Sequence, residues 1–272
     1  MAAVSGLIRV MEKAARKAGG RLRRDFGEVE HLQVSQKGPA DFVSKADRVS
    51  ERTIYDELLA ARPGWGFVLE EGGVIEGEEG QPRWIIDPLD GTSNFLHGIP
   101  HFAISIAAQE RKLDGSGWGD VVAGVVYQPI TDETFWAEKT RGAWLHDKRL
   151  RVSGRRHLGE ALIATGSPYG ARGDFDEWTR IFGAIGPQVA GIRRFGSASL
   201  DLAWVAAGRF DGFWESDLAE WDTAAGCLIV REAGGFVSDY RGRSAPILAK
   251  QVLAANDALH SRLHKILAGA LK

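Results

Sequence analysis

The sequence is poor in cysteine and in long apolar runs, and it carries almost no net charge. Its single cysteine, Cys227, excludes an intramolecular disulfide framework and a cysteine-rich zinc site, and it favours a reducing compartment. No stretch approaches the roughly 18 consecutive apolar residues that a membrane helix needs. Charged residues interrupt the first apolar stripe at helical intervals, unlike the core of a signal peptide. We therefore expect a soluble, cytoplasmic protein without a membrane segment.

The charge balance gives no reason to expect a nucleic-acid or membrane partner. The 34 Lys and Arg residues against 36 Asp and Glu give a formal net charge of -2, so no overall positive field attracts polyanions. A local basic patch that contacts nucleic acid or the transcription machinery stays open as an alternative, although nothing in the composition indicates it. A small polar partner fits better, and 272 residues suffice for one large core or two joined ones.

The apolar spacing predicts a mixed α+β chain. It indicates a helix that starts near Leu7 and ends near Gly19-Gly20, and another from just after Ser44 to the break at Pro63. Further predicted helices cover 197–207 and 221–232, and predicted strands cover 84–86, 102–108, 121–127, 134–136, 142–145, 212–214 and 235–240. We expect a single domain over residues 1–272 with two subdomains at roughly 1–150 and 151–272.

The segment from Asp87 to Thr92 is the first candidate site. A short apolar strand delivers Asp87, Pro88 stiffens the chain after it, and Asp90 follows three positions later. Two carboxylates within reach of each other repel unless a cation lies between them. Oxygen ligands without histidine or cysteine favour Mg²⁺ over zinc. A capped turn without a metal explains this motif, taken alone, about equally well.

Two further features favour a phosphate site. Gly91 followed by hydroxyl residues at a predicted helix start offers unpaired backbone N–H groups, which suit an anion. A second motif, Trp221 to Gly226, places Asp222 in the first turn of a predicted helix, and the small residues after it permit close packing.

Together, the run from Asp87 to Phe95 and the run from Trp221 to Gly226 resemble the two signatures of the inositol monophosphatase family, above all the bacterial inositol-1-monophosphatases. The resemblance implies a layered α-β-α-β-α sandwich of the type shared with fructose-1,6-bisphosphatase. It also implies a homodimer, inhibition by lithium, and hydrolysis of a small phosphorylated polyol, most simply myo-inositol 1-phosphate, by water activated by two or three Mg²⁺ ions.

The resemblance also assigns roles to individual residues. The metal ligands would be Glu70, Asp87, the carbonyl of Leu89, Asp90 and Asp222, with Glu71 as the alternative to Glu70. The catalytic residues would be Asp47, Glu70 and Thr92. The substrate contacts would be Asp90, Gly91, Thr92, Gly196, Ser197, Ala198, Glu215 and Asp222.

Several alternatives stay open from the sequence. The same acids support hydrolysis of histidinol phosphate, fructose 1,6-bisphosphate or 3′-phosphoadenosine 5′-phosphate in relatives, and some relatives regulate transcription by binding its machinery. His97 and His101 follow the first motif, but we expect them to have structural roles, since the family does not use histidine there.

Overall fold

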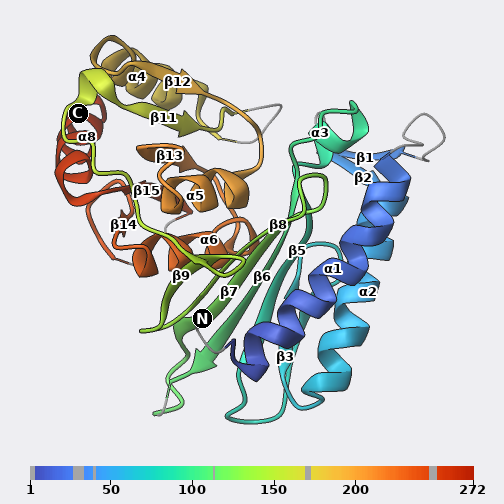
Figure 1. The fold of residues 1–272 in the computed structure, drawn as a ribbon. Coiled ribbons are helices and arrows are strands. Elements are labelled where there is room, and N and C mark those ends of the chain that lie inside the picture. The colour runs from blue at the N-terminus through green and yellow to red at the C-terminus, as the bar shows by residue number, and fades with distance from the viewer. Residues whose placement is uncertain (1–3, 27–33, 39–40, 113, 169–172, 245–249) are drawn as a thin grey trace.

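The computed structural model describes residues 4–26, 34–38, 41–112, 114–168, 173–244 and 250–272, with side-chain detail outside 34–38 and 41–44. A pair of helices, α1 (Gly6–Phe26) and α2 (Lys45–Ala61), forms the first layer. Their buried apolar faces pack on one side of a large sheet, as Figure 1 shows. A short hairpin of β1 (Val34–Gly38) and β2 (Asp41–Ser44) connects them.

The large sheet is the second layer and has the strand order β10-β9-β8-β7-β6-β5-β3-β4. Its strands β3 and β5 run parallel to each other, and its other pairs of neighbouring strands are antiparallel. Its central strands are buried on both faces, which explains their continuous apolar runs. The strands are β3 (Gly66–Leu69), β4 (Gly73–Ile75), β5 (Arg83–Asp90), β6 (Ala103–Arg111), β7 (Trp118–Gln128), β8 (Glu133–Glu138), β9 (Gly142–Leu145) and β10 (Lys148–Arg149).

The third layer consists of α5 (Ala198–Ala206) and α6 (Glu220–Glu232), which lie between the large sheet and a smaller one. The smaller sheet has the order β12-β11-β13-β15-β14, and β11 runs parallel to both of its neighbours. One apolar cluster contains residues of both sheets and of both helices, so this layer is the central core. The strands are β11 (Leu162–Thr165), β12 (Gly191–Arg193), β13 (Gly212–Ser216), β14 (Phe236–Ser238) and β15 (Gln251–Ala255).

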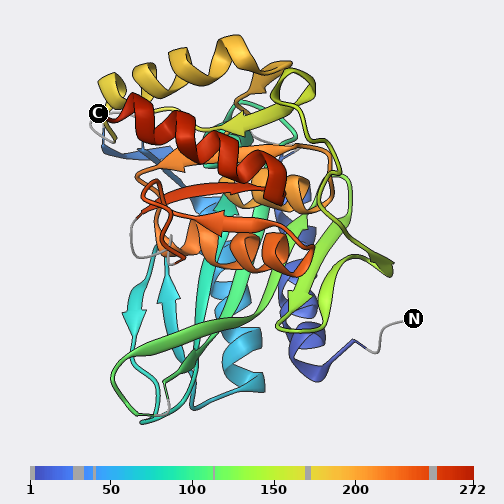
Figure 2. The ribbon, with the colours of Figure 1, turned by 90° about the vertical axis from the view of Figure 1, so that its left-hand side faces the viewer.

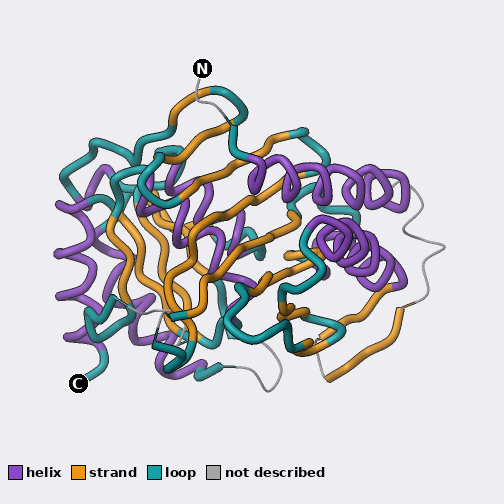
Figure 3. Tube along the Cα trace, turned by 90° about the horizontal axis from the view of Figure 1, so that it is seen from below, coloured by secondary structure: helices purple, strands orange, loops and turns teal. Residues whose placement is uncertain are grey.

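The outer layer is formed by α4 (Phe175–Ile185) and α8 (Asp257–Ala270), which pack together against the smaller sheet. Figure 2 shows both helices at the surface beside this sheet, and Figure 3 shows helices on either side of the strands. The predicted α-β-α-β-α sandwich is therefore confirmed. No helix of the described residues combines the length and the apolar character required to cross a bilayer.

Most predicted elements are present, although some of their bounds differ. The first helix does not end at Gly19-Gly20 but continues to Phe26. A Cβ on Gly19 would lie 2.5 Å from the ring of Tyr127 on β7, so the glycine permits close packing of helix on sheet. This contact outweighs the weak helix propensity of glycine. The sequence patterns also missed β1, β2, β3, β4, β10, β11, β12, β15, α4 and α8.

Candidate active site

The turn after β5 is held in place by hydrogen bonds on both sides. The predicted strand end at Asp87 was too early: β5 continues to Asp90, and its register against β6 shifts between Asp87 and Asp90. The backbone N–H of Leu89 donates to Asp87 Oδ1 at 3.0 Å, and Thr92 Oγ1 donates to the carbonyl of Leu89 at 3.0 Å. The register shift between Asp87 and Asp90 interrupts regular strand pairing, so the carboxylates and carbonyls of these residues are available to a ligand.

Gly91 is required by the geometry of the same turn. Its φ is +96°, a left-handed conformation that non-glycine residues seldom adopt. A Cβ at this position would approach the carbonyl oxygens of His101 and Gly196 at 3.1 and 3.3 Å. Here the β5 end, the start of β6 and the loop before α5 meet.

Asp90 joins the large sheet to the N-terminus of α5. Its Oδ2 accepts hydrogen bonds from Ser197 Oγ at 2.7 Å, from the backbone N–H of Ser199 at 2.8 Å and from Ser199 Oγ at 2.6 Å. The backbone N–H of Ala198 donates to Oδ1 at 3.3 Å. The carboxylate thereby caps α5 from a distant strand and brings Ser197 and Ala198 to the β5 turn. Ser199 was missed, because its sequence position inside a predicted helix gave no sign of this contact.

A polar cavity of about 400 Å³ lies at this junction. Every residue that the sequence nominated for the site lines it, except Asp47 and the alternative ligand Glu71. The acids come from separate elements: Glu70 follows β3, Asp87 and Asp90 end β5, Glu215 lies on β13, and Asp222 lies in the first turn of α6. Asp222 Oδ2 accepts from the backbone N–H of Ala219 at 2.7 Å, which fixes the start of that helix.

Glu70 and Asp87 resist ionisation in the folded protein. Burial raises the pKa of Glu70 well above its ordinary value, and repulsion from Asp47 and Asp222 adds to the effect. Burial also raises the pKa of Asp87, with further repulsion from Glu70 and Asp90. Such a concentration of negative charge favours the binding of a cation.

Asp47 and the two glutamates after β3 have distinct positions. Asp47 is buried in the first turn of α2, behind the cavity wall, and its charge acts on Glu70. Glu70 itself lines the cavity, whereas the backbone N–H of Glu71 donates to Glu51 Oε2 at 2.8 Å. This arrangement favours Glu70 over its neighbour as the residue that faces a ligand.

The donor set fits Mg²⁺. It offers carboxylate and carbonyl oxygens from Glu70, Asp87, Leu89, Asp90 and Asp222, and hard cations prefer oxygen ligands. Within the part of the chain that the structure describes, no group of three or more acid, histidine or cysteine side chains is already placed to hold a metal ion. Mg²⁺ keeps several waters and shares its coordination with a phosphate, so the chain need not supply the whole ligand shell.

Gly166 has a role that the sequence patterns missed. It follows β11 and lines the cavity, and a Cβ on it would lie 1.8 Å from Glu215 Oε1. The absence of a side chain therefore provides the space that the Glu215 carboxylate occupies. Burial raises the pKa of Glu215, and repulsion from Asp201 and Asp222 raises it further.

Asn94 also escaped notice, although it is part of the first motif. Its Nδ2 donates to the carbonyls of His101 at 2.7 Å and Phe195 at 2.6 Å. It thereby ties α3 (Thr92–Leu96) to the loop that carries Gly196.

The two histidines lie outside the cavity wall. His101 is buried, burial lowers its pKa, and its Nε2 lies 3.8 Å from Asp201 Oδ1. His97 Nδ1 lies 2.8 Å from the carbonyl of Ser93 at the surface. Both positions agree with structural roles.

Comparison with known proteins accounts for this arrangement. The chain is 53% identical over 263 residues to the inositol-1-monophosphatase of Rhizobium meliloti, covering 97% of this chain and 96% of that protein. It is 44% identical to the Nus factor SuhB of Pseudomonas aeruginosa over 92% of this chain and 91% of the relative. A crystal structure of the extragenic suppressor protein SuhB from Bartonella henselae superimposes with a TM-score of 0.91 at 51% identity, covering 97% and 98% of the two chains.

The sequence profile that describes the inositol monophosphatase family matches residues 4–272, which is nearly the whole chain. The layered fold, the acid-lined cavity and these similarities agree. The chain belongs to the inositol monophosphatase family.

Proposed function

We propose that this phosphatase catalyses the Mg²⁺-dependent hydrolysis of a small phosphate monoester, with myo-inositol 1-phosphate as the substrate. The observation that carries the proposal is the convergence of mutually repelling carboxylates from the ends of β3 and β5 and the start of α6 on one cavity. Carboxylates with strongly raised pKa values are concentrated at functional sites, where the repulsion between them serves a function. The inositol-1-monophosphatase name of a relative at 53% identity supports the choice of substrate.

The proposed metal ligands are Glu70, Asp87, the carbonyl of Leu89, Asp90 and Asp222, which would hold two or three ions. When bound, Mg²⁺ supplies positive charge to the phosphate and the leaving oxygen and promotes ionisation of the attacking water. Because Asp87 and Glu70 have raised pKa values, their ionised forms are strained without a cation. This strain favours binding of the cation.

The chain's own residues would position the substrate and the water. Gly91 and Thr92 line the cavity, and their backbone N–H groups are assigned to the phosphate. Asp47, Glu70 and Thr92 are assigned as the catalytic residues, with Asp47 and Thr92 paired to aim the attacking water.

The alcohol portion of the substrate is assigned to the opposite wall. Gly196, Ser197 and Ala198 precede or begin α5, and Glu215 projects from β13. Burial raises the pKa of Glu215, and its carboxyl group is assigned to hydrogen bonds with the substrate hydroxyls. Asp90 and Asp222 contact both metal and substrate in this assignment.

The test is phosphate release by the purified protein from a panel of inositol, histidinol, fructose and nucleotide phosphates. We expect myo-inositol 1-phosphate to be hydrolysed best, with activity lost in EDTA, restored by Mg²⁺ and inhibited by lithium. Asp87→Asn should lower the activity by about 100-fold or more, since removing even an indirect metal partner costs 10- to 100-fold. Asp56→Asn, which removes an exposed carboxylate of α2, is the matched control. No hydrolysis of any member with Mg²⁺, or full activity in Asp87→Asn, would refute the proposal.

A second candidate function is regulation through binding of the transcription machinery, supported by the relatives named Nus factor SuhB. In that case the regulatory effect should survive Asp87→Asn, whereas phosphate release should not. A homodimer is part of the same proposal, and sedimentation at micromolar concentration tests it.

A further inference from the structure

The first residue of α6 forms an ion pair with the large sheet. Glu220 Oε2 lies 2.6 Å from Nη2 of Arg83, the first residue of β5. Both side chains are largely buried, with 12% of Arg83 and 28% of Glu220 exposed. Because solvent screens a buried pair less than an exposed one, this contact restrains the start of α6. Asp222, a proposed metal ligand, lies two residues further along the same turn.

Arg83 is itself held on two other sides. Its Nε donates to Gln109 Oε1 on β6 at 2.8 Å, and Gln109 Nε2 donates to the carbonyl of Gly119 on β7 at 3.0 Å. The guanidinium also lies over the ring of Trp118, 4.3 Å from the ring centroid. A planar guanidinium with an ion pair, a hydrogen bond and an aromatic ring around it has little freedom to rotate. Glu220 is therefore bonded to a fixed point of the sheet.

A second contact joins the same turn to the strand opposite Asp87. Ser105 Oγ on β6 donates to the carbonyl oxygen of Trp221 at 3.1 Å. Ser105 is also the register partner of Asp87 in the pairing of β5 with β6. The residue before Asp222 is thus bonded to the sheet position opposite another proposed metal ligand. A movement of this turn would change the separation between the carboxylates of Asp87 and Asp222.

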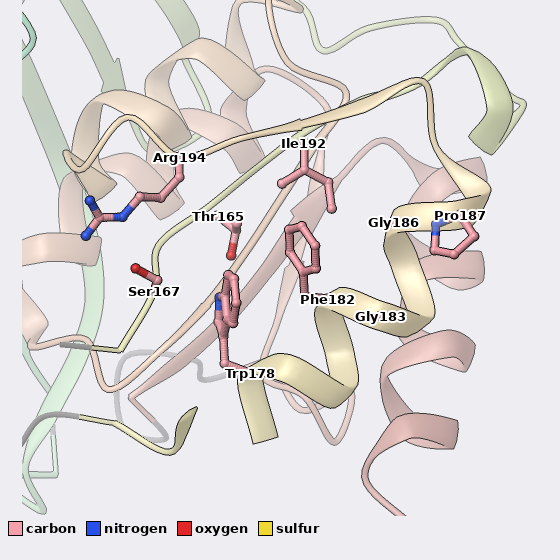
Figure 4. Close-up of a pocket in the computed structure, with 9 residues that line it drawn as sticks. All are labelled: Thr165, Ser167, Trp178, Phe182, Gly183, Gly186, Pro187, Ile192 and Arg194. Carbon is pink, nitrogen blue, oxygen red and sulfur yellow. The ribbon is translucent and has the colours of Figure 1, made fainter. Parts of the chain in front are cut away.

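Arg83 differs from Arg194, an arginine of the cavity wall. In Figure 4 the guanidinium of Arg194 points away from the ring of Trp178. Burial raises the pKa of Glu215 in this cavity, and the positive charge of Arg194 acts against that rise. Arg83 does not line the cavity, and its contact with the segment that carries the acids runs through Glu220.

We propose that Arg83 and Ser105 are positioning residues that fix the place of Asp222 in the metal site. The inference rests on the proposed Mg²⁺-dependent phosphatase function and deepens it. Arg83 holds the first turn of α6 through Glu220, and Ser105 holds it through the carbonyl of Trp221. When either contact is removed, the helix start relaxes and Mg²⁺ loses a well-placed ligand.

Arg83→Gln separates positioning from simple charge. The variant removes a positive charge beside a group of acids, so electrostatics alone would strengthen the binding of Mg²⁺. Loss of positioning would weaken it. Because removing an outer partner of a metal ligand costs about 10- to 100-fold in affinity, we expect about tenfold weaker Mg²⁺ binding in calorimetric titration without substrate. Ser105→Ala removes a neutral hydrogen bond and should weaken Mg²⁺ binding by about threefold.

Arg209→Gln is the matched control. Arg209 also pairs with a glutamate, Glu133, and its guanidinium also lies over a tryptophan ring, 5.1 Å from the centroid of Trp204. It does not line the acid-lined cavity, so the loss of this pair should leave the affinity for Mg²⁺ within about twofold. A double variant, Arg83→Gln with Glu220→Gln, keeps the net charge of the wild type and should still show the loss of affinity.

An affinity for Mg²⁺ in Arg83→Gln that equals or exceeds that of the wild type would overturn the role of Arg83. An unchanged affinity in Ser105→Ala would overturn the role of Ser105. A lower melting temperature at unchanged affinity counts against both roles, because the contacts would then only stabilise the fold.

The two proposals fail separately. If the wild type binds Mg²⁺ and the variants bind it more weakly, but no ester is hydrolysed, the phosphatase proposal is wrong and the positioning role stands. If myo-inositol 1-phosphate is hydrolysed and the variants bind Mg²⁺ as the wild type does, the phosphatase proposal stands and the positioning role is wrong. A wild-type protein that binds no Mg²⁺ refutes both proposals.

Discussion

Gly166→Ala should damage catalysis through Glu215 without unfolding the protein. The added Cβ would lie 1.8 Å from Glu215 Oε1 and 2.1 Å from its Cδ, whereas ordinary contacts begin near 3.4 Å. The carboxylate must therefore move by about 1.5 Å. It cannot move freely, because Asp90, Asp201 and Asp222 all repel it.

The expected magnitude follows from that displacement. Misplacing a substrate contact by about 1 Å costs on the order of 100-fold in rate, which corresponds to about 2.7 kcal/mol. We expect kcat/KM for myo-inositol 1-phosphate to fall by roughly this factor. The melting temperature should change little, because the clash involves the end of a side chain and not the backbone.

The assay is steady-state phosphate release combined with thermal unfolding of the same preparations. Gly154→Ala is the control, since a Cβ there meets nothing within 4 Å. In a Glu215→Ala background, Gly166→Ala should have no further effect, because the residue it displaces is gone. The reasoning is refuted if Gly166→Ala retains wild-type kcat/KM, or if its full loss persists in the Glu215→Ala background.

Two further predictions concern the acids. Because the folded protein raises the pKa values of Glu70 and Asp87, it binds more protons than the unfolded chain above the ordinary carboxyl pKa of about 4. In EDTA, the contribution of these two acids to stability is therefore greatest below that pH and declines as the pH rises through their raised pKa values. Asp87→Asn should make this decline shallower, and Mg²⁺ should offset it at neutral pH. Thermal unfolding from pH 4 to pH 8 measures the effect of the mutation and the effect of Mg²⁺. Ser199→Ala removes the 2.6 Å hydrogen bond to Asp90 and should lower the free energy of unfolding, measured by urea denaturation, by about 1.5 to 3 kcal/mol. An unchanged free energy of unfolding would contradict a stabilising role of this hydrogen bond.

The sequence was informative where chemistry and chain position coincide. The run from Trp84 to Thr92 contains a strand, a turn and the acids, so local rules predicted acids near a strand end, although β5 continues to Asp90. The helices at 45–61, 198–206 and 220–232 carry apolar residues at regular spacing and lie within a residue or two of their predicted bounds. The family resemblance then supplied the layered fold, which local patterns do not encode.

The errors arose where distant packing decides the local structure. Gly19 suggested a helix end, but its contact with Tyr127 of β7 is made only in the folded protein. The strand β11 was missed because Leu162–Thr165 is only four residues long and its partners, β12 and β13, are both distant in sequence. Without β11, the significance of Gly166 immediately after it was hidden.

The same limit applies to the carboxylates. Asp90 was expected to bind a metal, and the sequence contained no sign that it also caps α5 across the central layer through Ser197 and Ser199. These hydrogen bonds favour the ionised form of Asp90, while burial disfavours it. The hydrogen bonds of the cap therefore oppose the rise in the pKa of Asp90 that burial causes. The cap also anchors the end of α5 that carries Ala198, one of the proposed substrate contacts. The same hydrogen bonds therefore affect both the charge of a proposed metal ligand and the position of a substrate contact.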